Sequence, residues 1–248
     1  MYKRQHIDTV LQRGYFHAKH CEDALVTESL ANDRRLLAVM DGCSMGKEAV
    51  FASLLIVKLL RKIAKEERYK DFVQPSTTTL KEQLKTVLNE LFLGLNDMKR
   101  MLDLDKYELL STLVIGVVCE KQQEAEVLVV GDGVVCVNTD VYDFEQDNAP
   151  DYLGYHLDEP FDTWYAAQQQ RVSCNQLEQL LLATDGVHAF KNLKEPADQE
   201  NSDTVIAALC ATDRMEGSFV KLARLVNNLE KANAWKATDD LAVIRCDF

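Results

Sequence analysis

The residues best suited to chemistry are acidic residues that stand at the ends of apolar, strand-like runs. Strand ends hold such side chains rigidly yet close to solvent, and carboxylates that converge there repel one another unless cations neutralise them. Hard ions such as Mg²⁺ and Mn²⁺ prefer oxygen ligands of this kind. A pair of such ions can generate hydroxide and clamp a phosphoryl group during in-line displacement. The candidates are Glu22-Asp23, Asp41-Gly42, Asp132, Asp185-Gly186 and Asp239-Asp240.

A simpler explanation applies to each of these positions taken alone. Asp followed by Gly after a strand is often only a turn, because Asp bonds its own backbone and Gly accepts a positive φ angle. The number of these acidic positions, and their order along the chain, favour a shared site instead.

The first half of the chain must supply two strands and two long helices to position these residues. Two β-prone runs flank the polar turn ANDR and predict a hairpin over residues 24–41. A helix is predicted over 47–67, which lacks Gly and Pro. A second is predicted within 75–104, where apolar residues recur at i, i+3 and i+4 spacing. One of the threonines at 77–79 is expected to cap it.

The second half of the chain is rich in β-structure. Continuous β-prone runs over 110–140 have short connections and predict antiparallel neighbours. The polar stretch 140–176 predicts loops, with a strand around Trp164–Val172. Next come the strand QLLLA, a helix over Ser218–Lys231 and the closing strand LAVIRCD. This order predicts an α+β fold in which two antiparallel β-sheets pack face to face and are flanked by helices.

Composition narrows the classes of function. The 248 residues are 47% apolar and 27% charged, and no linker-like stretch divides them, so we expect a single domain over residues 1–248. No apolar run reaches the roughly 18 residues that a membrane span needs, and the N-terminus lacks the apolar region of a signal peptide. The net charge of −12 argues against nucleic acid or an anionic membrane as the main partner.

Cysteine usage fits a cytoplasmic protein with reduced thiols. The seven cysteines are odd in number and form no CxxC pair, which indicates neither a disulfide framework nor a thiolate zinc site. His17, His20 and Cys21 have HxxHC spacing and offer a rival zinc site. No second ligand cluster accompanies them, so a solvated basic loop beside the acidic centre is the simpler explanation.

The acidic motifs, taken in order, resemble those of the PP2C-type (PPM family) metal-dependent protein serine/threonine phosphatases, and the chain is similar to a divergent, bacterial-like member. The family's early Glu-Asp pair is matched by Glu22-Asp23, and its DG motif before a long helix by VMDGCSMGKEA. Its GSTA, GDSR, SDG and final DN or DD motifs are matched by LLSTLVIGVV, VVGDGVV, LLATDGVHAF and TDDLAVIRC. The resemblance implies the family's PP2C-like αββα sandwich, which agrees with the predicted order of elements.

The resemblance also implies a metal centre with two Mg²⁺ or Mn²⁺ ions. Asp41 would bridge the two ions, and Gly42 would offer its backbone carbonyl to one of them. Asp185 and Asp239 would bind the other ion, and Glu22 would hold metal-bound waters. Asp240 falls on a variable position of the final motif and receives no role.

Other site residues follow in part from the resemblance and in part from departures from it. Asp23 would orient the attacking hydroxide, and Asp132 would supply an additional, weaker metal position for a third ion. The family often grips phosphate with an Arg four residues before the Glu, and this position is Ala18. Lys19, His17 and His20 are nearby substitutes, although Lys is a point charge without the planar fork of Arg.

Further departures concern proton transfer and the GDSR motif. The family's His after DG, a candidate proton donor to the leaving group, is Cys43, although bacterial members often have Met there. His188 is an alternative donor, for which a packing or surface role is the simpler explanation. GDSR has become GDGV, which loses a polar pair. These changes bear on phosphate binding and acid catalysis more than on metal binding.

Two functions are consistent with these residues. The first is hydrolysis of phosphoserine or phosphothreonine in a phosphorylated protein by direct attack of a metal-bound hydroxide, without a phosphoenzyme. The second is a catalytically weak or inactive regulatory or binding module, a pseudophosphatase, and is motivated by the missing Arg and His. The retained carboxylates favour the enzyme, because such a cluster is costly to fold without metals. The working expectation for the oligomeric state is a monomer.

Overall fold

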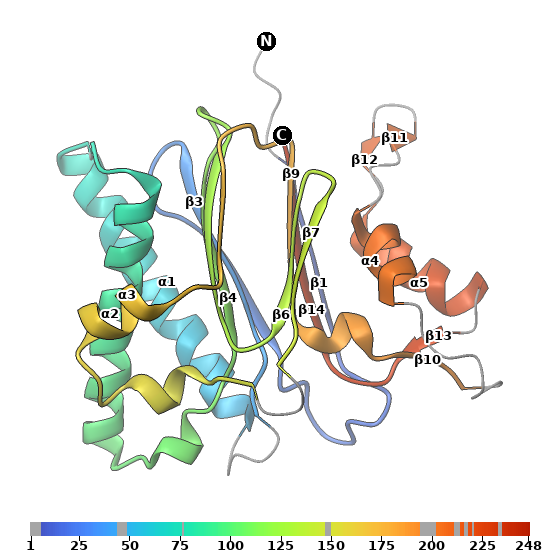
Figure 1. Cartoon of the computed structure of the whole chain (residues 1–248), viewed down its shortest axis with the longest axis horizontal. Helices are drawn as coiled ribbons and strands as arrows, with labels where there is room; N and C mark the ends of the chain where they lie inside the picture. Colours follow the sequence, from blue (N-terminus) through green and yellow to red (C-terminus); the bar gives the residue numbers. More distant parts are fainter. Residues whose placement is uncertain are drawn as a thin grey trace.

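Two five-stranded antiparallel sheets lie face to face at the centre of the molecule (Figure 1). The first has the strand order β1-β14-β9-β6-β7 and the second β2-β3-β4-β5-β8. The computed structural model describes residues 6–43, 49–75, 77–146, 150–193, 202–210, 214–215, 218–219, 221–232 and 235–248. The predicted α+β sandwich is confirmed.

In the described part of the chain, the strands form two large sheets and two small ones. The first sheet contains β1 (His6–Gln12), β14 (Leu241–Asp247), β9 (Gln179–Ala183), β6 (Gly133–Val137) and β7 (Asp140–Phe144). The second contains β2 (Ala24–Ser29), β3 (Arg34–Met40), β4 (Leu113–Cys119), β5 (Glu124–Val130) and β8 (Arg171–Cys174). Two-stranded sheets are formed by β10 (Phe190–Asn192) with β13 (Trp235–Ala237) and by β11 (Arg214–Met215) with β12 (Ser218–Phe219). The 3-10 helices are η1 (Lys106–Glu108), η2 (Leu153–His156) and η3 (Asp185–His188).

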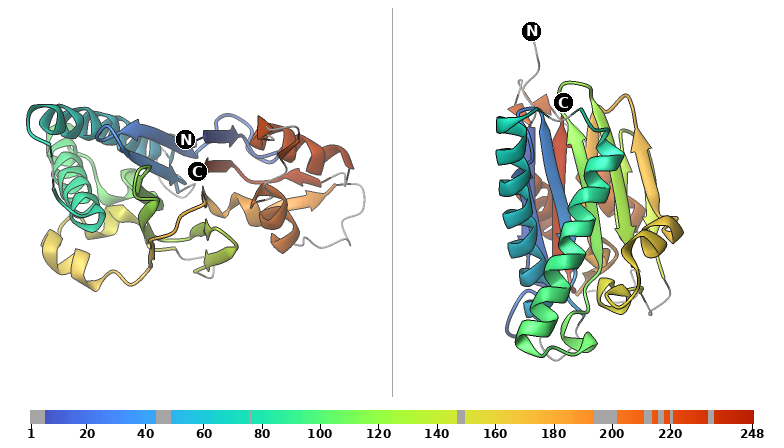
Figure 2. Two further views of the ribbon diagram at one scale, coloured as in Figure 1. Left: turned by 90° about the horizontal axis from the view of Figure 1, so that it is seen from above. Right: turned by 90° about the vertical axis from the view of Figure 1, so that its left-hand side faces the viewer.

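Helices cover both outer faces of the sandwich. On the second sheet lie α1 (Ala49–Val73), α2 (Leu80–Leu102) and α3 (Phe161–Ala167), and Figure 2 shows α1 and α2 side by side over its face. On the first sheet lie α4 (Ser202–Cys210) and α5 (Leu222–Ala232). None of the helices in the described part of the chain combines the length and apolar character needed to cross a bilayer.

The core has three apolar layers, and this explains the continuous apolar runs of the central strands. Successive side chains of a strand point to opposite faces of its sheet. In β3, Leu37 and Val39 face the layer between the sheets, whereas Leu36, Ala38 and Met40 face α1 and α2. Strands buried on both faces need apolar residues at every position rather than at alternate ones.

The long helix α2 confirms the second helix predicted from the sequence. It begins after Thr79, whose side chain accepts a hydrogen bond from the backbone N–H of Glu82, while the Glu82 carboxylate accepts one from the Thr79 backbone. This capping box satisfies two N–H groups that the first turn leaves without partners. The apolar stripe faces the second sheet, and the helix ends at Asp103 in a left-handed conformation.

Two boundaries in the second half of the chain were predicted wrongly. Trp164 lies in the helix α3 rather than in a strand, and β8 begins only at Arg171. The ring centroid of Trp164 lies 4.3 Å from that of Phe92 in α2. Aromatic residues of this segment therefore form the buried face of a short helix and not part of a strand. The helix expected from Ser218 begins at Leu222, because Ser218 pairs within β12. The elements β1, β7 and α4 were not predicted.

The turn between β5 and β6 carries the chain from one sheet to the other. The β-prone runs in this region were expected to be neighbours, and this is correct for β4 and β5 but wrong for β5 and β6. Gly131 and Gly133 have φ angles of +85° and +145°, which side chains rarely tolerate. A Cβ atom on Gly131 would also lie 2.4 Å from the carbonyl oxygen of Asp151. The GDG sequence therefore permits the crossover and places Asp132 at its tip.

Candidate metal centre

The predicted acidic residues gather at one end of the sandwich. The antiparallel register of β2 and β3 places Asp23, directly before β2, beside Asp41, directly after β3. In the first sheet, the registers of β6, β9 and β14 bring Asp132, Asp185 and Asp239 to the same end. Carboxylates from both sheets therefore converge there, as the sequence predicts.

A hydroxyl that the sequence analysis did not single out joins the two sheets at this end. Thr184 follows β9, and its Oγ1 donates a hydrogen bond of 2.6 Å to Oδ2 of Asp23. The same oxygen accepts a bond of 2.9 Å from the backbone N–H of Ala242 in β14. Thr184 is 1% exposed, so this link is shielded from water and fixes one face of the Asp23 carboxyl.

The carboxyl groups raise one another's pKa values. The pKa of Asp23 is raised to about 8, chiefly by burial, although the hydrogen bonds from Thr184 and with Asp41 oppose the shift. Burial and the charges of Asp23 and Asp185 raise the pKa of Asp41 well above its ordinary value. The pKa of Asp185 is raised to about 7 by burial and by the charges of Asp132 and Asp239. The described residues around these carboxyl groups thus carry too little positive charge to neutralise them.

Two buried oxygen atoms at this end lack a hydrogen-bond partner within the described ranges. They are Oδ1 of Asp23 and Oδ1 of Asp132. A buried carboxylate oxygen without a donor is costly, and a cation or its water shell would satisfy it. The contact between the Asp23 and Asp41 carboxyls is a hydrogen bond only while one of them holds a proton. These features fit a site for divalent cations.

A ready-made cage of protein ligands is not formed. Within the described part of the chain, no three His, Cys, Asp or Glu side chains lie close enough together to hold a metal ion directly. This agrees with the chemistry of Mg²⁺, which dehydrates reluctantly and is usually held by one or two carboxylates through retained waters. A cation at this end would therefore need water molecules among its ligands.

Gly42 lies where three backbone segments meet. A Cβ atom at this position would lie 2.2 Å from the carbonyl oxygen of Ala49 and 3.0 Å from that of Glu22. The Glu22 carbonyl also accepts a hydrogen bond of 2.7 Å from Oγ of Ser53 in α1. The glycine after Asp41 is needed because the start of α1 and the segment that carries Glu22 both pack directly against it.

Asp240, to which the sequence analysis gave no role, organises the loop before β2. It is 2% exposed and accepts hydrogen bonds from the backbone N–H groups of Gly14, at 2.7 Å, and Glu22. Nδ1 of His17 lies 2.9 Å from its Oδ2, and Nε2 of the same ring lies 3.1 Å from Oδ1 of Asp239. His17 thus bridges the two aspartates, and Asp240 positions Glu22. The sequence shows the pair Asp239-Asp240, but no local pattern indicates that Asp240 is the buried one of the two.

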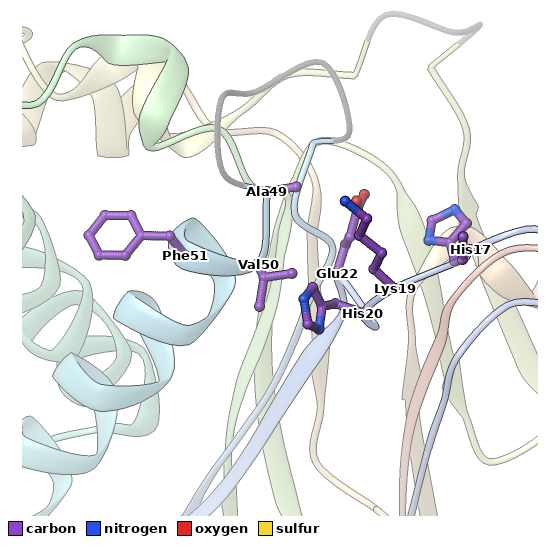
Figure 3. A pocket seen from close by; sticks show the side chains of 8 residues that line it. His17, Lys19, His20, Glu22, Ala49, Val50 and Phe51 are labelled. Atoms are coloured by element: carbon purple, nitrogen blue, oxygen red, sulfur yellow. The ribbon is translucent and has the colours of Figure 1, made fainter.

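A pocket of about 720 Å³ adjoins the acidic centre. Figure 3 shows Lys19, His20 and Glu22 between the first turn of α1 and His17. The side chains of Lys19 and His20 are exposed on the loop between β1 and β2. Ala18, at the position where the family often has Arg, also lines this pocket. The two basic residues therefore border the same cavity as Glu22.

The two candidate proton donors differ in their surroundings. Cys43 is 4% exposed and packs with Leu110 and Tyr152, so its thiol belongs to the core. His188 in η3 lies 3.2 Å, through Nε2, from Oδ1 of Asp143, and this hydrogen bond raises its pKa. The charge of His188 lowers the pKa of Asp185. Of these two residues, His188 is the one with a resolved electrostatic effect on Asp185 of the acidic centre.

Two sheets between helices, with carboxylates from both sheets at one end, define a PP2C-type phosphatase fold. The protein phosphatase 2C family model matches residues 13–231, and the chain belongs to this family. No curated protein matches the sequence significantly.

Solved structures of bacterial proteins share the fold. The phosphatase domain of SpoIIE from Bacillus subtilis, with a fragment of its regulatory domain, is 16% identical with a TM-score of 0.61; the match covers 98% of this chain and 63% of that one. Stp1 from Staphylococcus aureus, a serine/threonine phosphatase, is 14% identical with a TM-score of 0.60, and the match covers 99% of this chain and 96% of that one. RsbX in complex with magnesium is 13% identical with a TM-score of 0.57, and the match covers 98% of this chain and 94% of that one. At these identities the likeness is one of fold.

Proposed function

We propose that the protein is a Mg²⁺- or Mn²⁺-dependent serine/threonine phosphatase that hydrolyses phosphoserine or phosphothreonine in a protein substrate. The observation that carries the proposal is the convergence of carboxylates from both sheets, with raised pKa values and buried oxygens that lack partners in the described structure. Membership of the protein phosphatase 2C family supports the same reaction.

The cations would be held by the residues that match the family's motifs. Asp41, Asp185 and Asp239 would hold the cations through their carboxylates, in part by way of water molecules, and Gly42 would contribute its backbone carbonyl. Glu22 acts through water, and Asp132 supplies an additional position. Bound divalent cations lower the pKa of water and neutralise phosphate oxygens.

The residues beside the cations would bind and orient the reactants. Asp23 keeps one oxygen on the Thr184 hydroxyl and has the other available to accept a hydrogen bond from the attacking water. Lys19 and His20 line the adjoining pocket, where the Lys19 ammonium group would attract the phosphate group of the substrate and the His20 ring could form a hydrogen bond with it. His188 would be the donor of a proton to the leaving alkoxide, because its hydrogen bond with Asp143 raises its pKa and its charge acts on Asp185.

A second candidate function is a binding module that recognises phosphorylated protein without turning it over. Ala18 provides no guanidinium for the phosphate, and the Cys43 thiol is packed into the core. Both departures reduce the chemistry available at the site while leaving the carboxylates intact.

Turnover and metal binding separate the two functions. Purified protein should hydrolyse p-nitrophenyl phosphate and a phosphothreonine peptide when Mn²⁺ is added, and calorimetry should show more than one Mn²⁺ bound. The Asp41→Asn and Asp239→Asn variants should lose this activity. Asp162→Asn is a matched control, because the Asp162 side chain is 81% exposed on α3, away from the centre. Phosphopeptide binding without turnover by the folded protein would establish the module instead.

A further inference from the structure

Two of the seven cysteines meet on the outer face of the first sheet, away from the acidic centre. Cys136 lies in β6, and Cys210 is the last residue of α4, the helix that packs on this sheet (Figure 1). Their thiols lie close enough for each to shift the pKa of the other. Both side chains line one pocket of about 440 Å³ and pack in the same apolar cluster. The fold thus brings together two residues that are far apart in the sequence.

The two thiols have different surroundings. Cys136 is 1% exposed, whereas Cys210 is only partly buried and is the more accessible of the two. The hydrogen bond from Cys136 lowers the pKa of Cys210, and the charge of Arg245 acts in the same direction against the effect of burial. The pKa of Cys136 is raised by this hydrogen bond and by burial. Cys210 is therefore the better nucleophile and Cys136 the thiol that remains protonated.

A buried arginine of the first sheet contacts the end of α4 beside the two cysteines. Arg245 in β14 is 1% exposed, and its Nη1 donates a hydrogen bond of 3.1 Å to the carbonyl of Leu209, the residue before Cys210. Its Nε lies 3.2 Å from Oδ2 of Asp247, which offsets part of its charge. The bond to Leu209 holds the end of α4 against the sheet and so keeps Cys210 next to Cys136.

We propose that Cys136 and Cys210 form a reversible dithiol–disulfide pair that reacts with peroxides. The Cys210 thiolate attacks the O–O bond of hydrogen peroxide and becomes a sulfenic acid, and the leaving hydroxide takes a proton to form water. The Cys136 sulfur then displaces the sulfenic hydroxyl, which leaves as a second water with the Cys136 proton. Two thiols and one peroxide thus give one disulfide and two waters. Thiol reductants reverse the reaction by exchange.

The disulfide would tie α4 to the sheet that carries part of the acidic centre. In α4, Val205 and Ile206 belong to the same apolar cluster as Val187 of η3, the short helix that begins with Asp185. A bond from Cys210 to β6 closes a long loop of the chain and so removes conformational freedom from the unfolded state. Oxidation is expected to raise the melting temperature by about 5–10 °C.

Peroxide treatment followed by peptide mapping tests the pair. The reduced protein is treated with stoichiometric hydrogen peroxide, and the wild type is compared with Cys210→Ser and Cys136→Ala. Cys174→Ser is the matched control, since Cys174 is also partly buried but lies in β8, at the edge of the other sheet. The wild type and the control should lose two hydrogen atoms in mass, yield a Cys136–Cys210 linked peptide and show the higher melting temperature. Dithiothreitol should reverse all three changes.

Both pair variants should lack the linked peptide and the rise in melting temperature while retaining a folded circular dichroism spectrum when reduced. The Cys210→Ser variant changes the less buried position of the pair and so tests the proposal should Cys136→Ala fail to fold. A wild type in which Cys210 is oxidised but never linked to Cys136, or in which neither thiol reacts, would overturn the proposal. So would a linked peptide that joins other cysteines.

Discussion

Two almost fully buried carboxylates at opposite ends of the sandwich have opposite surroundings. Asp247 is 2% exposed; its Oδ1 accepts a hydrogen bond of 2.8 Å from Nε2 of Gln179, and its Oδ2 lies 3.2 Å from Nε of Arg245. Asp23 is 4% exposed, has a hydroxyl on one oxygen and no partner within the described ranges on the other, and lies among carboxylates. One carboxylate is neutralised by the protein, whereas the other needs charge from solution.

The largest expected effect comes from reducing the charge at the acidic end. Asp185→Asn removes a carboxylate that raises the pKa of Asp41, so the metal-free protein should become more stable. Turnover with Mn²⁺ should fall by more than about 100-fold, because even outer-shell partners of metals are worth about 10- to 100-fold. Thermal denaturation in chelator and initial rates with Mn²⁺ measure the two effects. Equal activity in variant and wild type would remove Asp185 from the site.

The reverse pattern is expected at the other end. Asp247→Asn withdraws the carboxylate that faces Arg245 in the core, which should cost about 3 kcal/mol of unfolding free energy. Turnover per folded molecule should stay at the wild-type level, since Asp247 lies at the far end of β14 from the centre. Urea denaturation and rates at low temperature would check this. A variant that is stable but inactive would contradict the division between the two ends.

One substitution beside the acidic centre is expected to increase activity. Ala18→Arg restores a guanidinium beside the pocket that Ala18 already lines, and a bidentate fork binds phosphate better than an ammonium group. We expect kcat/KM for a phosphopeptide to rise about 10-fold, chiefly through a lower KM. Ala18→Lys is the control for charge alone. An unchanged KM in both variants would mean that phosphate does not approach from this loop.

The smallest expected effect is the pH dependence of stability without metal. The pKa values of Asp23 and Asp185 are raised from 3.8 to about 8 and about 7, so the folded state keeps protons that the unfolded state has lost. Unfolding free energy and melting temperature in chelator should therefore both fall as pH rises from about 5 to 8. Scans in chelator, and again with Mn²⁺, would show the drop and its reversal. A melting temperature that rises over this range in chelator would contradict the shifts.

The fold was largely predictable from the sequence because the strands and α2 follow local rules. The apolar stripe and the threonine cap of α2, and the strand runs that end in acid and glycine, are signals between near neighbours in the chain. The error at Trp164 arose because an aromatic residue suits a strand and a helix face equally well, and only the contact with Phe92 decides between them.

The candidate site was less predictable in its supporting residues than in its carboxylates. Asp41 and Asp185 stand in recognisable motifs, whereas the roles of Thr184 and Asp240 depend on residues more than 150 positions away in the chain, at separations of 161 and 226. Such partners become neighbours only after the sheets have packed, so no local pattern marks them.

The apolar layer between the sheets also determines how far apart the carboxylates of the two sheets lie. Asp41 belongs to one sheet and Asp185 to the other, so the gap between their carboxylates is determined by the thickness of the packed layer that contains Val129, Val135 and Leu182. Interiors are close-packed, and a change of one methylene in such a layer is transmitted rather than absorbed. In the proposed phosphatase, substitutions far from any metal ligand should therefore change the preference between Mg²⁺ and Mn²⁺ through the dimensions of the core alone.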